Sequence, residues 1–317
     1  MGKLLSILLF LVNITQAFAS DDDIIFRNAE IINEYTSRLP FKLIDHLIVV
    51  EAELYGKIGN FIIDTGSEAL ILNKMHFASK YPHHKKYKQS SGVNGTIENT
   101  QIRLLHEFRL HNFSIKNIKS DVIDLSHIER SKKMNLLGII GFEILKKYEV
   151  FIDLHLNQIT LSKVDKYGNR FDKNTYLEKI TDSINFNLVN HTIVLNAFVK
   201  DQKVRFCLDS GAEYNQINSQ INKKTLKSFF PKKRLYLIGV SNKKIEVLLG
   251  KLYRVKLNKT IYFGPMYTVL TNLNKMNEAY GTKLDGVLGY EFLMQKRTII
   301  NYQKEKLFFI DYPKKYK

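Results

Sequence analysis

The sequence predicts an all-β chain of two similar lobes related by pseudo-twofold symmetry, with short helices. One observation is a motif of an Asp after an apolar strand-like run, followed by a hydroxyl residue and a Gly, at FIIDTG (61–66) and again at FCLDSG (206–211). The other is an apolar segment with two Gly residues, LLGIIGFEIL (136–145), which aligns without a gap on LDGVLGYEFL (284–293). Since both segments recur in the same order, we expect half of the chain to fold twice.

The composition fits a globular protein with room for two lobes. The chain has 317 residues, of which 44% are hydrophobic and 25% are charged, so each half is long enough to bury a core. It contains one cysteine, Cys207, and an internal disulfide is therefore excluded. Because Cys207 lies inside an apolar strand, we expect a buried core thiol and not a nucleophile.

The N-terminal segment 1–19 has the features of a secretory signal peptide. A single Lys precedes an apolar run from Leu4 to Val12, and Ala17-Phe18-Ala19 offers a cleavage site. The alternative is a membrane anchor, but the apolar run is too short to span a bilayer. We expect cleavage after Ala19, export to the periplasm or secretion, and no stable membrane insertion of the mature protein.

The net charge of +17 does not by itself assign a function. A nucleic-acid-binding protein would gather its basic residues in one patch with interleaved aromatic residues, whereas the lysines here are scattered through nearly every loop. We therefore expect a solvated basic surface and no nucleic-acid partner. His76, His83 and His84 lack further ligands at suitable spacing, so no metal site is expected.

The strand and turn patterns divide the chain into five parts. After the signal peptide, residues 20–44 read as an N-terminal arm or a short helix. Residues 45–164 form the N-terminal lobe, which opens with a hairpin leading into Asp64 and closes with another hairpin. Residues 165–185 are polar and fit a linker or a crossing strand. Residues 186–312 replay the first lobe.

Two further turns lie between extended segments and mark hairpin tips that could cover a cleft. The first is the Gly-punctuated stretch SSGVNGTIEN, with Gly92, Val93 and Gly95 as candidate flap residues. The second is LIGVSNKK, with Gly239 and Val240. Both tips are interpreted as mobile flaps, and an ordinary surface turn is the alternative for each.

On these motifs the sequence resembles the aspartic peptidases, specifically the retropepsin-like group. That family has Asp-Thr/Ser-Gly at the end of a strand, a flap hairpin, and a later apolar-apolar-Gly segment behind the Asp loop. The resemblance covers about residues 45–162 and 188–311. It implies a monomer of two retropepsin-like (acid protease) β-barrel lobes, a fold that retroviral enzymes assemble from two chains. It implies no cofactor.

The repeat and the resemblance together place a catalytic pair at Asp64 and Asp209. Two carboxylates held close together cannot both ionise cheaply, so the pair would share a proton and activate a water molecule. We expect supporting roles for the residues that follow each Asp and for a Gly behind each loop: Thr65, Gly66, Ser67, Ser210, Gly211, Gly141 and Gly289. The hydroxyls of Thr65 and Ser210 would tie the two loops together.

One difference between the two motifs predicts unequal roles for the aspartates. Ser67 stands where the second motif has Ala212. If the Ser67 hydroxyl donates to Asp64, it favours the charged form there, which would make Asp64 the base and Asp209 the proton-bearing partner.

The sequence also departs from the retroviral pattern. Gly141-Phe142-Glu143 and Gly289-Tyr290-Glu291 stand where retroviral enzymes carry Gly-Arg-Asp. The partners of Glu68 and Glu213 are therefore not predicted.

These observations predict an aspartic endopeptidase that hydrolyses a peptide bound in extended conformation between the lobes. The alternative is a noncatalytic peptide-binding protein that uses the same cleft. Two intact Asp residues favour the enzyme, because recognition alone does not need two ionisable groups forced together.

Overall fold

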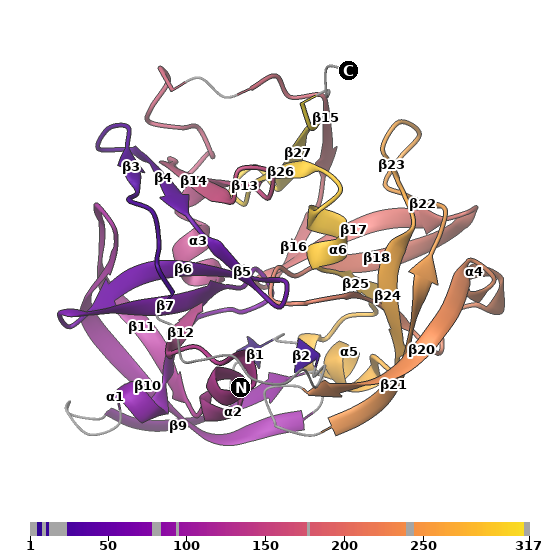
Figure 1. Cartoon of the computed structure of the whole chain (residues 1–317), viewed down its shortest axis with the longest axis horizontal. Coiled ribbons are helices and arrows are strands. Elements are labelled where there is room, and N and C mark those ends of the chain that lie inside the picture. Colours follow the sequence, from indigo (N-terminus) through magenta and orange to yellow (C-terminus); the bar gives the residue numbers. More distant parts are fainter. Residues whose placement is uncertain are drawn as a thin grey trace.

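The protein consists of two β-rich lobes and a third sheet, which lies above both lobes in the view of Figure 1. The computed structural model describes residues 5–7, 11–12, 24–77, 84–92, 95–175, 178–238 and 244–313. Helices in the described part are short: α1 Lys74–Phe77, α2 Ser126–Lys132, α3 Phe142–Leu145, α4 Lys223–Leu226, α5 Asn274–Tyr280 and α6 Tyr290–Leu293. The predicted all-β class with short helices is thus confirmed.

The sheet of the N-terminal lobe runs through nine described strands in the order β1-β9-β10-β11-β8-β12-β7-β6-β5. Their bounds are β1 Leu5–Ile7, β5 Lys42–Ile44, β6 Leu47–Leu54, β7 Lys57–Ile63, β8 Leu70–Asn73, β9 His84–Gly92, β10 Gly95–Leu110, β11 Phe113–Ile123 and β12 Leu136–Ile140. Strand β7 ends directly before Asp64.

The sheet of the C-terminal lobe repeats this arrangement with eleven described strands, in the order β2-β20-β21-β24-β19-β25-β18-β17-β22-β23, with β16 beside β17. Their bounds are β2 Leu11–Val12, β16 Asn187–Val189, β17 Thr192–Val199, β18 Gln202–Leu208, β19 Asn215–Asn218, β20 Phe229–Ile238, β21 Lys244–Leu252, β22 Val255–Lys256, β23 Tyr262–Phe263, β24 Met266–Thr271 and β25 Gly286–Leu288. Strand β18 ends directly before Asp209.

The two lobes share the same unusual strand pairing next to their Asp loops. In each lobe the strand before the Asp runs parallel to the Gly-containing strand, with Ile62 opposite Ile139 in one and Cys207 opposite Val287 in the other. The following strand is antiparallel to the same Gly-containing strand. The predicted duplication is therefore present in the pairing as well as in the sequence.

A third sheet joins the lobes, in the order β15-β27-β26-β13-β14-β4-β3. Its strands are β3 Glu30–Ile31, β4 Thr36–Pro40, β13 Tyr148–Asp153, β14 Gln158–Lys163, β15 Asp182–Asn185, β26 Arg297–Asn301 and β27 Lys306–Ile310. At its centre β13 of the first half pairs with β26 of the second, with Val150 opposite Ile300. The closing hairpins of the two halves thus build one structure.

A buried arginine reinforces the junction between the halves. Arg297 on β26 lies 2.5 Å from the Asp153 carboxylate on β13 and 2.6 Å from the Glu178 carboxylate. Its side chain is almost fully buried, so it needs a carboxylate partner to balance its charge, and Asp153 is the buried one of the two.

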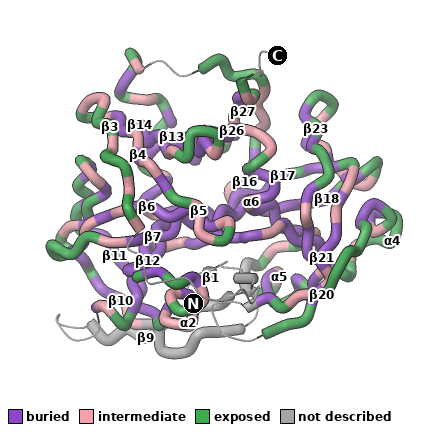
Figure 2. The backbone as a smooth tube through the Cα atoms, in the orientation of Figure 1, coloured by how far each residue is buried: buried purple, intermediate pink, exposed green. Residues whose placement is uncertain are grey.

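Buried residues concentrate where the strands of each lobe face the lobe interior (Figure 2). Each lobe has a hydrophobic cluster that contains apolar side chains at repeated positions. These include Val49, Ile62 and Ile139 in the first lobe and Val194, Cys207 and Val287 in the second. Cys207 is buried, as predicted, and burial raises the pKa of its thiol well above the usual range.

The N-terminal arm is built into the sheets. Residues 30–44, expected as an arm or a short helix, form β3, β4 and β5, with β4 on the edge of β14 and β5 on the edge of β6. The polar stretch 165–185 ends in β15, which pairs with β27.

Two strands near the N-terminus extend the hairpins of both lobes. Strand β1 pairs in parallel with β9, with Ile7 opposite Gly92. Strand β2 pairs antiparallel with β20, with Leu11 opposite Ile238. Residues 5–7 therefore pair with a hairpin of the first lobe and residues 11–12 with a hairpin of the second (Figure 1).

Candidate active site

The two Asp loops have matching backbone geometry. The amide of Asp64 donates to the carbonyl of Ile140 at 3.0 Å, and the amide of Asp209 donates to Leu288 at 2.9 Å. Both carboxyl groups are fully buried. Strands β7 and β18 thus deliver the aspartates to equivalent positions, one from each lobe.

The carboxyl groups of Asp64 and Asp209 lie within hydrogen-bonding reach of each other. The Oδ2 atom of each lacks a hydrogen-bond donor among the described residues. A proton on one of the acids would allow a hydrogen bond between the carboxyl groups, since a carboxylic acid can donate where two carboxylates cannot. The predicted pair is therefore brought together by the fold.

Gly211 makes this close approach possible. A Cβ atom at that position would lie 2.7 Å from Asp64 Cγ and 2.8 Å from its Oδ2, closer than carbon atoms pack. The glycine of one motif therefore leaves space for the carboxyl group of the other.

The hydroxyl residues after each Asp tie the loops together across the lobes. The Ser210 amide donates to Thr65 Oγ1 at 2.9 Å, and the Thr65 amide donates to Ser210 Oγ at 3.0 Å. Each hydroxyl then donates to the opposite strand end, Ser210 Oγ to the Ile63 carbonyl and Thr65 Oγ1 to the Leu208 carbonyl. This reciprocal set fixes the separation of the two aspartates.

The two carboxyl groups accept different sets of hydrogen bonds from backbone N–H groups. Asp64 Oδ1 accepts from the amides of Gly66 at 2.8 Å and Ser67 at 3.1 Å. Asp209 Oδ1 accepts from Gly211 at 2.8 Å. Burial raises the pKa of Asp64 to about 6. Burial and the neighbouring Asp64 raise the pKa of Asp209 well above its usual range.

The difference in pKa arises first from the pair itself, because the hydrogen bond between the carboxyl groups lowers the pKa of Asp64 and raises that of Asp209. The Ser67 hydroxyl donates to the carbonyl of Ala69 at 3.3 Å, so the expectation that it donates to Asp64 is wrong. The loop turns the Ser67 backbone N–H, and not its side chain, toward the carboxylate. Any residue with an N–H at position 67 could supply this bond.

We expect the rate of peptide cleavage at low substrate concentration to fall as the pH is lowered through about 6. In the role expected from the sequence, Asp64 is the base and must be ionised, and its raised pKa of about 6 sets the pH below which it is protonated. Below that value kcat/KM should drop about tenfold per pH unit. A pH profile of kcat/KM between pH 3 and 8 measures this limb.

The Ser67→Ala variant is the matched control for this profile. Because the backbone amide at position 67 is retained, the acid limb should stay where it is in the unsubstituted protein. A limb displaced by one pH unit would show that the hydroxyl acts on Asp64 after all.

Gly141 and Gly289 lie directly behind the two Asp loops. A Cβ atom on Gly141 would lie 2.5 Å from the Ala69 carbonyl oxygen and 2.6 Å from that of Ser67, and one on Gly289 would overlap the Ala212 carbonyl. The next amides donate to the loops, Phe142 to Ser67 at 2.8 Å and Tyr290 to Ala212 at 2.9 Å. The glycines therefore permit these supporting bonds.

The candidate flap residues are described only in part. Gly92 ends β9 and Gly95 begins β10, and the two are paired across the hairpin. Val93, Gly239 and Val240 lie outside the described residues. In the second lobe the pairing of β20 with β21 extends to Ile238 opposite Lys244, so the hairpin is present up to its tip.

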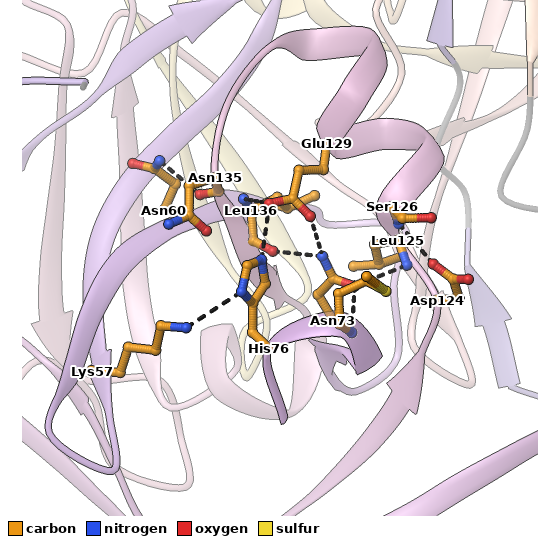
Figure 3. Close-up of polar contacts among 11 residues, drawn as sticks. Lys57, Asn60, Asn73, His76, Asp124, Leu125, Ser126, Glu129, Asn135 and Leu136 are labelled. Atoms are coloured by element: carbon orange, nitrogen blue, oxygen red, sulfur yellow. Dashed lines mark hydrogen bonds and ion pairs between the residues drawn. The ribbon is translucent and has the colours of Figure 1, made fainter. Parts of the chain in front are cut away.

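A polar network supports the first lobe behind the site (Figure 3). Asn73 accepts from the Leu125 amide at 3.1 Å, and Glu129 accepts from the Leu136 amide at 3.3 Å. His76 lies on α1 and contacts Glu129 Oε1 at 2.9 Å. Within the described residues no group of three His, Cys, Asp or Glu is placed to hold a metal ion.

The second lobe contains the counterpart of this network. Asn218 accepts from the Leu273 amide at 3.4 Å, and Asn277 accepts from the Leu284 amide at 2.8 Å. Asn277 therefore stands where the first lobe has Glu129. These bonds hold α2 and α5 against the strands that lead to the two Gly segments.

Sequence reasoning missed a group of residues that join the lobes beside Asp209. Lys132 of the first lobe lies 2.5 Å from the Glu213 carboxylate, and His46 Nδ1 donates to the Glu213 carbonyl at 3.2 Å. The His46 ring stacks on Tyr290. We call Asp45, His46, Lys132, Glu213 and Tyr290 the inter-lobe cluster. His46 and Lys132 lie outside the motifs, so no pattern pointed to them.

A separate cavity of about 670 Å³ lies in the second lobe. It is lined by residues of the β17–β18 turn, α4 and the start of β20, together with Tyr253 and Arg254. Neither aspartate contributes to it. The candidate active site is therefore identified by the carboxyl pair and not by this cavity.

Comparison with known families matches the part of the chain around the first Asp motif. Residues 50–143 match the family described as Aspartyl protease. The retropepsin-like resemblance drawn from the sequence is thus confirmed.

One solved structure supports the two-lobed fold. The aspartic proteinase from Irpex lacteus covers 87% of this chain and 97% of its own, with a TM-score of 0.51 and 12% identity, which concerns the fold. The retropepsin-like aspartic protease from Rickettsia conorii covers 40% of this chain and 90% of its own, with a TM-score of 0.29 and 19% identity. No curated protein matches the sequence significantly.

Proposed function

We propose that the protein is an aspartic endopeptidase that uses Asp64 and Asp209 as a catalytic pair. The observation that carries this proposal is the buried contact between the two carboxyl groups, each with one oxygen that lacks a protein donor. Burying two such acids together costs free energy in a folded protein. A functional role for the pair explains why the fold bears this cost.

In the proposed reaction one aspartate acts on the attacking water and the other on the peptide carbonyl oxygen. Ionised Asp64 takes a proton from a bound water molecule as the water oxygen attacks the peptide carbonyl carbon. Protonated Asp209 donates to the carbonyl oxygen as negative charge develops there. As the C–N bond of the resulting gem-diol breaks, Asp64 gives its proton to the leaving amine and Asp209 takes a proton from a gem-diol hydroxyl, so the pair again holds one proton.

The substrate is proposed to bind as an extended strand. Supporting this, β1 and β2 of the protein's own N-terminal stretch pair with β9 and β20, the hairpins of the two lobes. Backbone hydrogen bonds of this kind give affinity without regard to sequence. Side-chain preference would then come from the surfaces between the hairpins and the Asp loops.

Export is proposed from the sequence of residues 1–19. None of the described helices is long and apolar enough to cross a membrane. Cleavage after Ala19 would remove β1 and β2 and free both hairpin edges for a substrate strand. Sequencing the N-terminus of the protein recovered from its producing cell tests this proposal.

The second candidate function is peptide binding without cleavage. The same hairpin edges favour it, because they accept an extended chain whether or not the carboxyl pair is active. It differs from the enzyme in having no product.

A mixed peptide library separates the two functions. The mature protein is incubated with the library between pH 3 and 8, and new termini are identified by mass spectrometry. We expect internal cleavage that is absent with the Asp64→Asn, Asp209→Asn double variant. Cleavage that persists in the double variant would refute the catalytic role of the Asp64–Asp209 pair. Retention of intact peptides would favour the binding protein.

A further inference from the structure

The inter-lobe cluster contains an ion pair that water does not reach. The Lys132 side chain and the Glu213 carboxylate are 0% and 2% exposed, and 2.5 Å separates Lys132 Nζ from Glu213 Oε1. Asp45 provides a second carboxylate 3.0 Å from Nζ and is 58% exposed. Lys132 ends α2 of the first lobe, whereas Glu213 belongs to the second. The buried pair therefore crosses between lobes.

A second set of contacts joins the same two segments. The His46 imidazole donates from Nδ1 to the Glu213 carbonyl at 3.2 Å, and its ring lies 4.3 Å from the Tyr290 ring with an interplanar angle of 3°. Burial lowers the pKa of His46, which favours the neutral imidazole. First-lobe residues thus hold Glu213 by both its carboxylate and its carbonyl group.

These contacts bear directly on the Asp209 loop. Glu213 is the fourth residue after Asp209. Tyr290 follows Gly289, and its amide donates to Ala212 at 2.9 Å. The cluster therefore contacts two segments of the second lobe that shape the Asp209 loop. One is the turn that contains Glu213, and the other is the Gly segment behind it.

The lysine of this ion pair is not repeated in the sequence. Gly138 aligns with Gly286, and the same offset places Tyr280 at the position of Lys132. By the offset of the two Asp motifs, Glu213 aligns with Glu68, and Asp45 and His46 align with Asn190 and His191. The glutamate and the histidine are therefore repeated, whereas Lys132 and Asp45 are not.

We propose that Lys132 is a positioning residue that, through Glu213, holds the Asp209 loop against the first lobe and sets how closely its carboxyl group approaches Asp64. This inference rests on the proposed peptidase function. A displacement of about 1 Å at reacting groups can lower a rate about a hundredfold. A tether four residues from the acid is therefore expected to affect turnover more than substrate affinity.

The test compares the wild type with the Lys132→Met, Glu213→Gln double variant. This variant removes the tether without leaving a buried charge unpaired, so its stability should stay near that of the wild type. We expect kcat to fall at least about tenfold with KM changed less than about twofold. Hydrogen exchange followed by mass spectrometry should show faster exchange for residues 209–214 and unchanged exchange for residues 64–69.

The Asp45→Asn variant is the matched control, because it removes a charge of the same cluster but leaves Lys132 and Glu213 paired. Its kcat and exchange should equal those of the wild type. A double variant with wild-type kcat and wild-type exchange at 209–214 overturns the proposal. If the double variant does not fold, Glu213→Gln alone, in which Lys132 keeps Asp45 as its partner at 3.0 Å, provides the same comparison under the same criteria.

Exchange also separates this inference from the proposed function. A wild type without peptidase activity would refute the peptidase and leave the exchange comparison intact. In that case, faster exchange confined to 209–214 supports the tether, and equal exchange refutes it.

Discussion

The Asp64→Asn variant is expected to cleave peptides at least about 10⁴-fold more slowly than the wild type. Asn cannot take a proton from water, so the step assigned to Asp64 is lost. Asp209→Asn should have an effect of similar size, because Asn provides no transferable proton. The two losses should not add in the double variant, since the residues act as one unit. Values of kcat for one peptide from the library measure this.

The same variant should be more stable than the wild type at neutral pH. The folded state keeps a proton on Asp64 up to about pH 6, whereas an ordinary Asp releases it near 3.8. The stability linked to this proton is full below about 3.8 and is lost as the pH rises through about 6. Over this window the charged carboxylate costs about 3 kcal/mol, which Asn avoids.

Denaturant unfolding at pH 7 and at pH 3.5 checks this sign. We expect Asp64→Asn to gain stability relative to the wild type at pH 7 and to show little difference at pH 3.5. Equal stability of the two proteins at pH 7 would mean that the pKa of Asp64 is not raised by burial. A stable but inactive variant would also rule out misfolding as the cause of the lost cleavage.

The Gly141→Ala variant is expected to lose about 1–3 kcal/mol of unfolding free energy. The added Cβ would lie 2.5 Å from one backbone oxygen and 2.6 Å from another, both in the loop that follows Asp64. Backbone atoms cannot move aside as a flexible side chain can, so the loop must shift. Activity per folded molecule should therefore fall as well, because the loop carries the catalytic carboxylate.

Gly264→Ala provides the control. A Cβ there would meet its nearest atom, the Gln295 amide oxygen, at 3.4 Å, which a flexible side chain can accommodate. Its unfolding midpoint should differ little from that of the wild type. A Gly141→Ala protein as stable as Gly264→Ala would show that the loop behind Asp64 tolerates displacement.

The sequence predicted those parts of the structure whose residues occur in both halves of the repeat. Asp64 and Asp209, the hydroxyl residues after them and the glycines behind them recur at matched spacing, and a residue that recurs in this way points to a contact across the axis. The reciprocal bonds between Thr65 and Ser210 follow directly from that symmetry.

The sequence did not predict contacts made by residues that are not repeated, or contacts that depend on how a side chain in a loop is oriented. Lys132 reaches Glu213 from 81 residues away, and its repeat position is a tyrosine. The partner of the Ser67 hydroxyl is decided by a side-chain rotation that the residue order does not determine. The sequence pattern did not predict strand β4. Its polar residues Thr36 and Ser37 are buried at the junction, whereas polar residues are usually exposed.

The shared sheet of β13 and β26 has a consequence for how the two half-sites meet. An enzyme assembled from two separate chains falls apart on dilution, because association competes with lost translational entropy. Here strands of both halves are paired within one molecule, and the aspartates meet at an effective concentration that dilution does not change. Specific activity should therefore be the same at nanomolar and micromolar protein.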